Sequence, residues 1–201
     1  MMDQGRLGIS MTYTADTLVT DSASSATQLA TGKFAGAEML GLDKDGNTQE
    51  NIIEKARRLG KATGLVSDTR ITHATPAAFA AHQTHRSQEN NIPEDLLATE
   101  VDVLLSGGLG YWIPEQASDK KSLIHQQLVQ TTGNSVEIKS SRKDTKNLFT
   151  IAQQKGYTLA FNNEQLQQAN GKRWACLRTP GCKMVLLKCN SKMIPNVFNR
   201  L

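Results

Sequence analysis

The chain has 201 residues, of which 38% are hydrophobic and 21% are charged, the composition of an ordinary globular domain. This length is enough to bury one substantial core. No apolar run approaches the roughly 20 residues that a membrane-spanning helix needs, which excludes a transmembrane segment. The first six residues lack the apolar core of a secretory signal, so we expect either a cytosolic protein or a chain whose first part is missing.

The formal net charge of +4 is unevenly distributed along the chain. Residues 171–201 hold seven Lys or Arg and no Asp or Glu, whereas residues 1–170 hold 16 basic and 19 acidic residues. The three cysteines, Cys176, Cys182 and Cys189, also lie in the last segment. This break in composition predicts a domain over 1–170 and a different kind of segment after it.

The first predicted helix begins at Asp21 or Ser22, after an extended segment over 12–20, and ends near Gly32. Asp and Ser are preferred N-cap residues, so the pair has a simple structural interpretation as a helix cap. The unpaired N–H groups and the dipole at a helix start also favour an anion there. The start of this helix is therefore also suited to binding a phosphate that the serine could attack.

The middle of the chain alternates between helix and strand patterns. Residues 47–50 have the spacing of a capping box and predict a helix that ends at Gly60. A short buried strand is predicted over 62–67. Thr75 and the proline that follows it predict another helix start, with the helix body over 77–83.

The same alternation continues to about residue 170. Helices are predicted over 93–98, 122–130, 144–155 and 163–169, and strands over 101–105 and 157–161. A glycine run over 107–110 suits a tight turn beside a ligand site, but its spacing is not that of a dinucleotide-binding loop. Strands that alternate with helices predict an α/β fold with a mostly parallel central sheet flanked by helices.

Three segments resemble the alkaline phosphatase family, in the family's order. They are Asp-Ser-Ala-x-x-Ala-Thr at 21–27, followed by Ala-Thr-Gly at 30–32; His-Ala-Thr-Pro-Ala-Ala at 73–78; and Thr-His-Arg at 84–86. The resemblance runs from about residue 12 to about residue 170 and covers well under half of a complete family member. It implies an incomplete α/β fold of the alkaline phosphatase type.

The resemblance implies hydrolysis of phosphate monoesters through a phosphoserine intermediate. Ser22 matches the family's nucleophile, which a bound zinc ion activates, and Arg86 matches the phosphate-binding arginine. Asp21 matches the residue that orients this arginine. Without the resemblance, we would interpret Arg86 as a solvated surface arginine and Asp21 as an N-cap residue.

The resemblance also implies Zn²⁺ and Mg²⁺ as cofactors. Ser22 is then a zinc ligand, Thr75 matches the threonine whose hydroxyl reaches magnesium, and His73 matches a position that tunes the magnesium site through water. By themselves, Thr75 is a helix cap and His73 a structural or surface histidine. His82 and His85 share a helix face, but the family draws its zinc ligands from other segments, so we expect His82 to pack or cap locally.

Most of the family's zinc ligands have no recognisable counterpart here. The first aspartate lies on a strand upstream of residue 1, and the remaining ligands come from the C-terminal half of the family. A zinc site with one or two protein ligands is too weak to drive the reaction. An inactive truncated fragment of the enzyme is therefore the alternative to an active phosphatase.

The segment 171–201 does not continue the family pattern, and we interpret it as a frameshifted, non-native tail. The cysteine spacings of six and seven match no common zinc ribbon. Its basic residues, with Trp174 and Phe198, are compatible with nucleic acid, but we expect no nucleic-acid partner. The family implies a periplasmic or extracellular homodimer that acts on small-molecule phosphate monoesters, although this chain shows no signal peptide.

Overall fold

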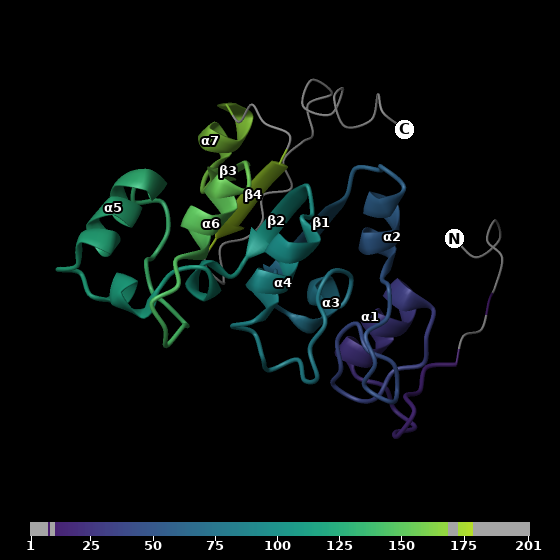
Figure 1. Cartoon of the computed structure of the whole chain (residues 1–201). Coiled ribbons are helices and arrows are strands. Elements are labelled where there is room, and N and C mark those ends of the chain that lie inside the picture. Colours follow the sequence, from purple (N-terminus) through teal and green to yellow (C-terminus); the bar gives the residue numbers. More distant parts are fainter. Residues whose placement is uncertain (1–7, 9–10, 169–172, 179–201) are drawn as a thin grey trace, which may run out of the picture.

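The computed structural model describes residue 8 and residues 11–168 and 173–178 (Figure 1). Four strands form one sheet in the order β1-β2-β4-β3, and each neighbouring pair is parallel. The strands are β1 (Gly64–Arg70), β2 (Val103–Gly107), β3 (Tyr157–Ala160) and β4 (Arg173–Arg178). The predicted α/β fold with a parallel sheet is confirmed.

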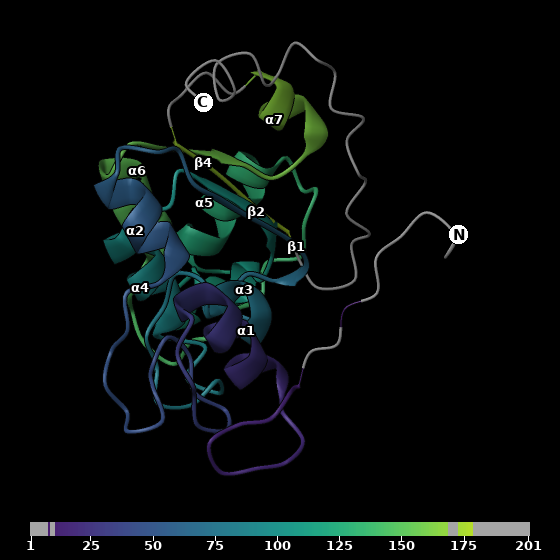
Figure 2. The same cartoon turned by 90° about the vertical axis from the view of Figure 1, so that its right-hand side faces the viewer.

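Helices form the connections between the strands, as parallel pairing requires. The connections hold α3 (Ala74–Ala77), α4 (Ile92–Thr99), α5 (Leu123–Thr132), α6 (Leu148–Gln154) and α7 (Asn163–Gln168), with short 3₁₀ turns η2 (Leu109–Tyr111) and η3 (Glu115–Ser118). Two further helices, α1 (Ser22–Thr31) and α2 (Ile52–Arg58), precede β1. Figure 2 shows α4 and α6 on one side of the sheet and α7 on the other. Both faces of this small sheet therefore have helical cover.

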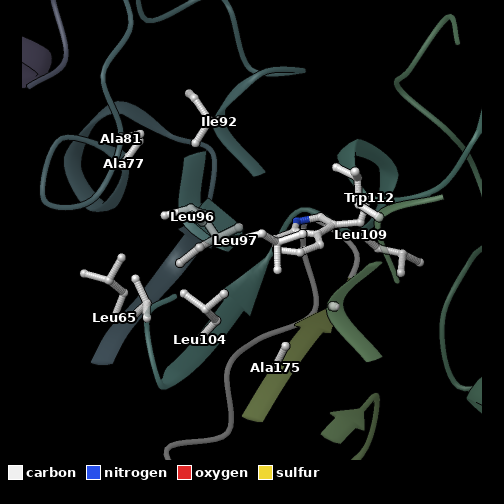
Figure 3. Close-up of a cluster of buried hydrophobic side chains, with 14 of the residues drawn as sticks. Leu65, Ala77, Ala81, Ile92, Leu96, Leu97, Leu104, Leu109, Trp112 and Ala175 are labelled. Carbon is white, nitrogen blue, oxygen red and sulfur yellow. The ribbon is translucent and has the colours of Figure 1, made fainter. Parts of the chain in front are cut away.

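The core lies between the central strands and α4. Leu96 and Leu97 of α4 lie over Leu104 of β2, and all three are almost fully buried (Figure 3). Full burial of a leucine side chain contributes about 1.5–3 kcal/mol. The buried ring of Trp112 stacks on Phe149 of α6 at a centroid distance of 6.1 Å, which attaches the segment after β2 to α6.

Alanines fill the contact between α1 and α3. Ala23 and Ala26 of α1, and Ala74 and Ala77 of α3, are all buried in the same core cluster. Because an alanine side chain is only a methyl group, the two helix backbones can approach closely. This packing brings the start of α1 near the turn between β1 and α3 (Figure 2).

The predicted capping box at 47–50 is wrong, because the box lies one turn later. Asn51 accepts a hydrogen bond from the Glu54 amide at 3.0 Å, and the Glu54 carboxylate accepts one from the Asn51 amide at 2.9 Å. Asn47 cannot begin the helix, since its amide donates to the Asp43 carboxylate and Thr48 is held in an antiparallel bridge with Leu42.

The predicted helix body over 77–83 is also wrong. The helix α3 covers only Ala74–Ala77, and His73 rather than Thr75 is its N-cap residue. A helix cannot extend to residue 83, because Gln83 forms an antiparallel bridge with Leu40 and a bridge of this kind needs extended backbone.

The strand β4 lies inside the segment 171–201, which the sequence analysis separates from the domain. It is hydrogen-bonded to β2 on one side and to β3 on the other. Residues 173–178 are therefore part of the sheet, and Cys176 lies on β4. The predictions for Cys182, Cys189 and Phe198 fall outside the described residues.

Candidate active site

Ser22 is the first residue of α1 and is half-buried. The extended backbone of Asp21 (ψ 173°) makes it the N-cap residue, and Gly32 in the left-handed region ends the helix, as predicted. The Asp21 carboxylate accepts from the amides of Ala23 and Ser24 at 2.6 and 3.3 Å. The helix start is thus capped by the residue next to Ser22.

The Asp21 carboxylate is ionised at neutral pH. Burial by itself raises its pKa, but four hydrogen bonds lower the pKa by more, so that it lies below the ordinary value. Besides the two helix amides, the Glu38 amide donates to Oδ2 at 2.9 Å and the Ser24 hydroxyl donates to it at 2.8 Å. The lone pairs of Asp21 are therefore largely used before any cation reaches it.

Arg86 lies directly against Ser22, although 64 residues separate them in sequence. The Arg86 Nη1 donates to Ser22 Oγ at 2.7 Å, and the same nitrogen lies 3.8 Å from Asp21 Oδ1. The Arg86 backbone amide donates to the Glu38 carbonyl at 2.8 Å. The structure thus brings together the three residues Ser22, Arg86 and Asp21 that the sequence analysis selects.

His73 lies on the other side of the Arg86 guanidinium. Its Nε2 is 3.4 Å from Arg86 Nη2, and because arginine can only donate, Nε2 must be the acceptor. Burial, together with the positive charges of Arg86 and Arg70, lowers the pKa of His73. The imidazole is therefore neutral at neutral pH, and its single lone pair, on Nε2, faces Arg86.

Glu89 joins the turn after β1 to the loop that contains Arg86. Its carboxylate accepts a bidentate pair from Arg70 at 2.8 and 2.9 Å and a hydrogen bond from the Thr72 hydroxyl at 2.6 Å. Burial raises the pKa of Glu89, but these bonds outweigh it and lower the pKa overall. The sequence analysis missed this network, because no local pattern pairs residues 17 and 19 positions apart.

Gly108 closes the same end of the sheet. Its φ of +102° lies in the region that favours glycine, and a Cβ there would meet the Cβ of Arg70 at 3.2 Å. The glycine run therefore makes a tight turn that leaves room for Arg70.

The predicted metal ligands do not form a complete site. Thr75 is exposed on α3, and His73 contacts the guanidinium of Arg86. Within the described residues, no group of three or more His, Cys, Asp or Glu is placed to hold a metal ion. His82 and His85 also have separate partners: His82 bonds to Gly41 and Glu54, and His85 bonds to Ser87.

This arrangement is suited to binding an oxyanion at a serine. The start of a ten-residue helix, a guanidinium and a hydroxyl meet at one point. A guanidinium can give two parallel hydrogen bonds to a phosphate, and a helix start favours the negative charge.

Comparison with known proteins gives the family of the chain. The sequence profile described as alkaline phosphatase matches residues 1–177, which contain all three segments quoted above. The chain belongs to the alkaline phosphatase family. It is 37% identical over 118 residues to alkaline phosphatase 4 of Bacillus subtilis (strain 168), a match that covers 55% of this chain and 26% of that protein.

Solved alkaline phosphatases share the fold. The alkaline phosphatase of the Antarctic bacterium TAB5 is 26% identical, with a TM-score of 0.67 over 85% of this chain and 43% of that chain. A histidine-to-aspartate variant of the same enzyme, solved with Mg bound in its M3 site, is 26% identical and has a TM-score of 0.65 over 85% and 42%. The chain spans about a quarter of the length of the curated alkaline phosphatases it matches.

The family match ends one residue before the end of β4. It therefore extends beyond residue 170, where the sequence analysis places the last recognisable family pattern. Among the described residues, none of the helices is long and apolar enough to cross a bilayer.

Proposed function

We propose that this chain binds phosphate monoesters and accepts the phosphoryl group on Ser22. The observation that supports this most is the 2.7 Å contact between Arg86 Nη1 and Ser22 Oγ at the start of α1. If Arg86 were only a solvated surface residue and Ser22 only part of a helix cap, nothing would require them to be in contact. Their contact therefore favours a functional role for both residues.

The proposed step is an in-line displacement at phosphorus. The Ser22 Oγ forms a bond to phosphorus while the bond to the ester oxygen breaks. The Ser22 hydroxyl proton passes to water, and the leaving alcohol oxygen takes up a proton from water. Arg86 stabilises the equatorial phosphate oxygens, and the dipole at the start of α1 favours the negative charge that develops. Water then hydrolyses the phosphoserine.

Asp21 supports this role without immobilising Arg86. Its carboxylate is held by four hydrogen bonds, and its 3.8 Å separation from Arg86 is longer than a hydrogen bond. The guanidinium is therefore oriented by charge while its donors can turn to a phosphate.

The described residues offer a candidate donor for the magnesium site but no zinc site. The exposed Thr75 hydroxyl has a donor oxygen suited to the proposed magnesium site, where His73 would act through water. The TAB5 variant binds Mg at its M3 site. The described residues nevertheless supply too few donors for a structural or catalytic zinc site, which needs three or four. No step above depends on either ion.

The same lack of metal donors among the described residues favours a second candidate. In that case the chain is an inactive piece of an alkaline phosphatase that retains the phosphate subsite. Export to the periplasm or the cell exterior and a homodimer are also proposals, and both rest on the family alone.

A phosphatase assay of the purified chain separates the two candidates. With Zn²⁺ and Mg²⁺ present, an active chain hydrolyses p-nitrophenyl phosphate, Ser22→Ala abolishes the activity, and Arg86→Lys lowers it about tenfold or more, since lysine cannot make the bidentate contact. Arg58→Lys is the matched control, because Arg58 is exposed on α2 and pairs with Glu50.

Activity that survives in Ser22→Ala would overturn the proposed nucleophile. A wild-type chain with no activity above background, less than one bound zinc per chain and Arg86-dependent binding of inorganic phosphate would support the inactive fragment.

A further inference from the structure

Glu38 has an unusual backbone conformation beside the candidate site. Its φ is +63°, and within the described residues only Glu100 and Asn134 share a positive φ without being glycine. The left-handed region is unfavourable for a glutamate, because its Cβ crowds the following carbonyl oxygen. Such a conformation persists where surrounding contacts impose it, and it is found at functional sites more often than elsewhere.

The two backbone polar groups of Glu38 connect the two halves of the site. Its amide donates to Asp21 Oδ2 at 2.9 Å, next to the nucleophile. Its carbonyl accepts from the Arg86 amide at 2.8 Å. One residue therefore joins the N-cap of α1 to the backbone of the phosphate-binding arginine.

A left-handed helical conformation, unlike an extended one, allows one residue to do this. An extended residue points its N–H and C=O to the same side, as in the hydrogen-bonded pairs of an antiparallel sheet. A helical residue of either hand points them in opposite directions. Glu38 therefore reaches two segments that lie on either side of it.

The neighbours of Glu38 hold it in this place. The Ala37 amide donates to Asp16 Oδ1 at 3.0 Å, and Thr27 of α1 donates to the Met39 carbonyl at 3.0 Å. Two further hydrogen bonds join Leu40 to Gln83, three residues before Arg86. The segment 37–40 is thus a spacer fixed to α1 on one side and to the Arg86 loop on the other.

We propose that Glu38 is a positioning residue whose left-handed backbone sets the Arg86 guanidinium at Ser22. This inference rests on the proposed function, since it assigns Glu38 to the same phosphate subsite. The Glu38 side chain makes a different contact, with His85 Nε2 at 3.4 Å, and both side chains are exposed there. The backbone conformation, and not the carboxylate, is therefore the part that acts.

Four variants test the proposal, with inorganic phosphate as the probe in isothermal titration calorimetry. Glu38→Gln removes the charge and Glu38→Gly removes the strain, so both should keep the dissociation constant within about twofold of wild type. Glu38→Val places a β-branched residue at a positive φ and should raise the dissociation constant about fivefold or more. Glu100→Val is the matched control at the end of α4, where φ is +56°, and should leave it unchanged.

A second readout does not depend on phosphate. Amide hydrogen exchange at Arg86 reports its bond to Glu38 and should accelerate in Glu38→Val but not in Glu100→Val or Glu38→Gln. If far-UV circular dichroism shows that Glu38→Val is unfolded, Glu38→Ala is measured in its place, with the same direction of change expected.

The outcomes separate the two proposals. If the wild type binds no phosphate, the proposed function fails, and the Arg86 exchange rates alone decide the role of Glu38. Unchanged phosphate affinity and unchanged Arg86 exchange in Glu38→Val would overturn it. An equal loss of phosphate affinity in Glu38→Gln would also overturn the proposed role of the Glu38 backbone, because the side-chain charge would then be responsible.

Discussion

The charged residues around Ser22 are used in two different ways. Glu89 holds Arg70 in a bidentate pair, so that Arg70 is neutralised and fixed. The Asp21 carboxylate lies 3.8 Å from Arg86 and accepts its hydrogen bonds from backbone amides and from a hydroxyl. Arg86 has no carboxylate in a bidentate pair with it, which is why we propose the phosphate site there and not at Arg70.

The Glu89 pair gives the fold a predictable response to acid. Because the folded-state pKa of Glu89 is lower than the unfolded value of 4.5, its contribution to the free energy of unfolding is complete above that pH. The contribution is lost as the pH falls through the folded-state value. We expect Glu89→Gln to lower the free energy of unfolding by about 1–3 kcal/mol at pH 7 and by less at pH 3.

Urea unfolding of the wild type and of Glu89→Gln at pH 7, 4 and 3 measures this difference. A difference that stays constant over the three pH values would show that the ionised carboxylate of Glu89 is not what stabilises the turn after β1.

The ends of helices and strands agree best with the sequence-based prediction where neighbouring residues alone determine them. The start of α1 at Asp21 and its end at Gly32 are both predicted, since a cap needs only neighbours within three residues. The strands β1 and β2 both begin two residues later than predicted. Thr63 and Asp102, the residues just before the two strands, are hydrogen-bonded to each other instead. The Thr63 amide and hydroxyl donate to the Asp102 carboxylate at 2.9 and 3.1 Å.

The strand β4 leads to a prediction about truncation. A chain that ends at Asn170 lacks the strand that pairs with both β2 and β3, whereas a chain that ends at Arg178 keeps every strand of the described sheet. We expect the longer piece to unfold cooperatively and the shorter one to lose its cooperative transition, because β3 then has no partner strand in the described sheet.

Thermal unfolding followed by circular dichroism compares the two pieces with the full chain. If the piece that ends at Asn170 melts like the full chain, β4 contributes nothing to stability and the domain boundary lies at residue 170, as the composition predicts.

At the scale of the whole molecule, the chain has a core and a proposed phosphate subsite but no metal-donor cluster within its described residues. A metal that binds only the folded state stabilises it by an amount that grows with the logarithm of its concentration over its Kd, so a weakly bound metal contributes little. We therefore expect removal of metals with EDTA to change the Tm by less than about 1 °C.

Differential scanning fluorimetry with and without EDTA measures this shift, and readdition of Zn²⁺ is the control. A fall in Tm of several degrees that zinc reverses would contradict the expectation and would locate metal ligands outside the described residues.

The sequence by itself determined the alternation of helices and strands, the parallel α/β class and the family. It also selected Ser22, Asp21 and Arg86, because short motifs preserve residue types that a reaction needs. Only the tertiary structure decided that Arg86 lies on Ser22, that Glu89 holds Arg70, that Glu38 bridges the site and that β4 completes the sheet. These contacts join residues 17 to 71 positions apart, and local propensity does not specify such distant partners. Burial and hydrogen bonding in the folded chain do.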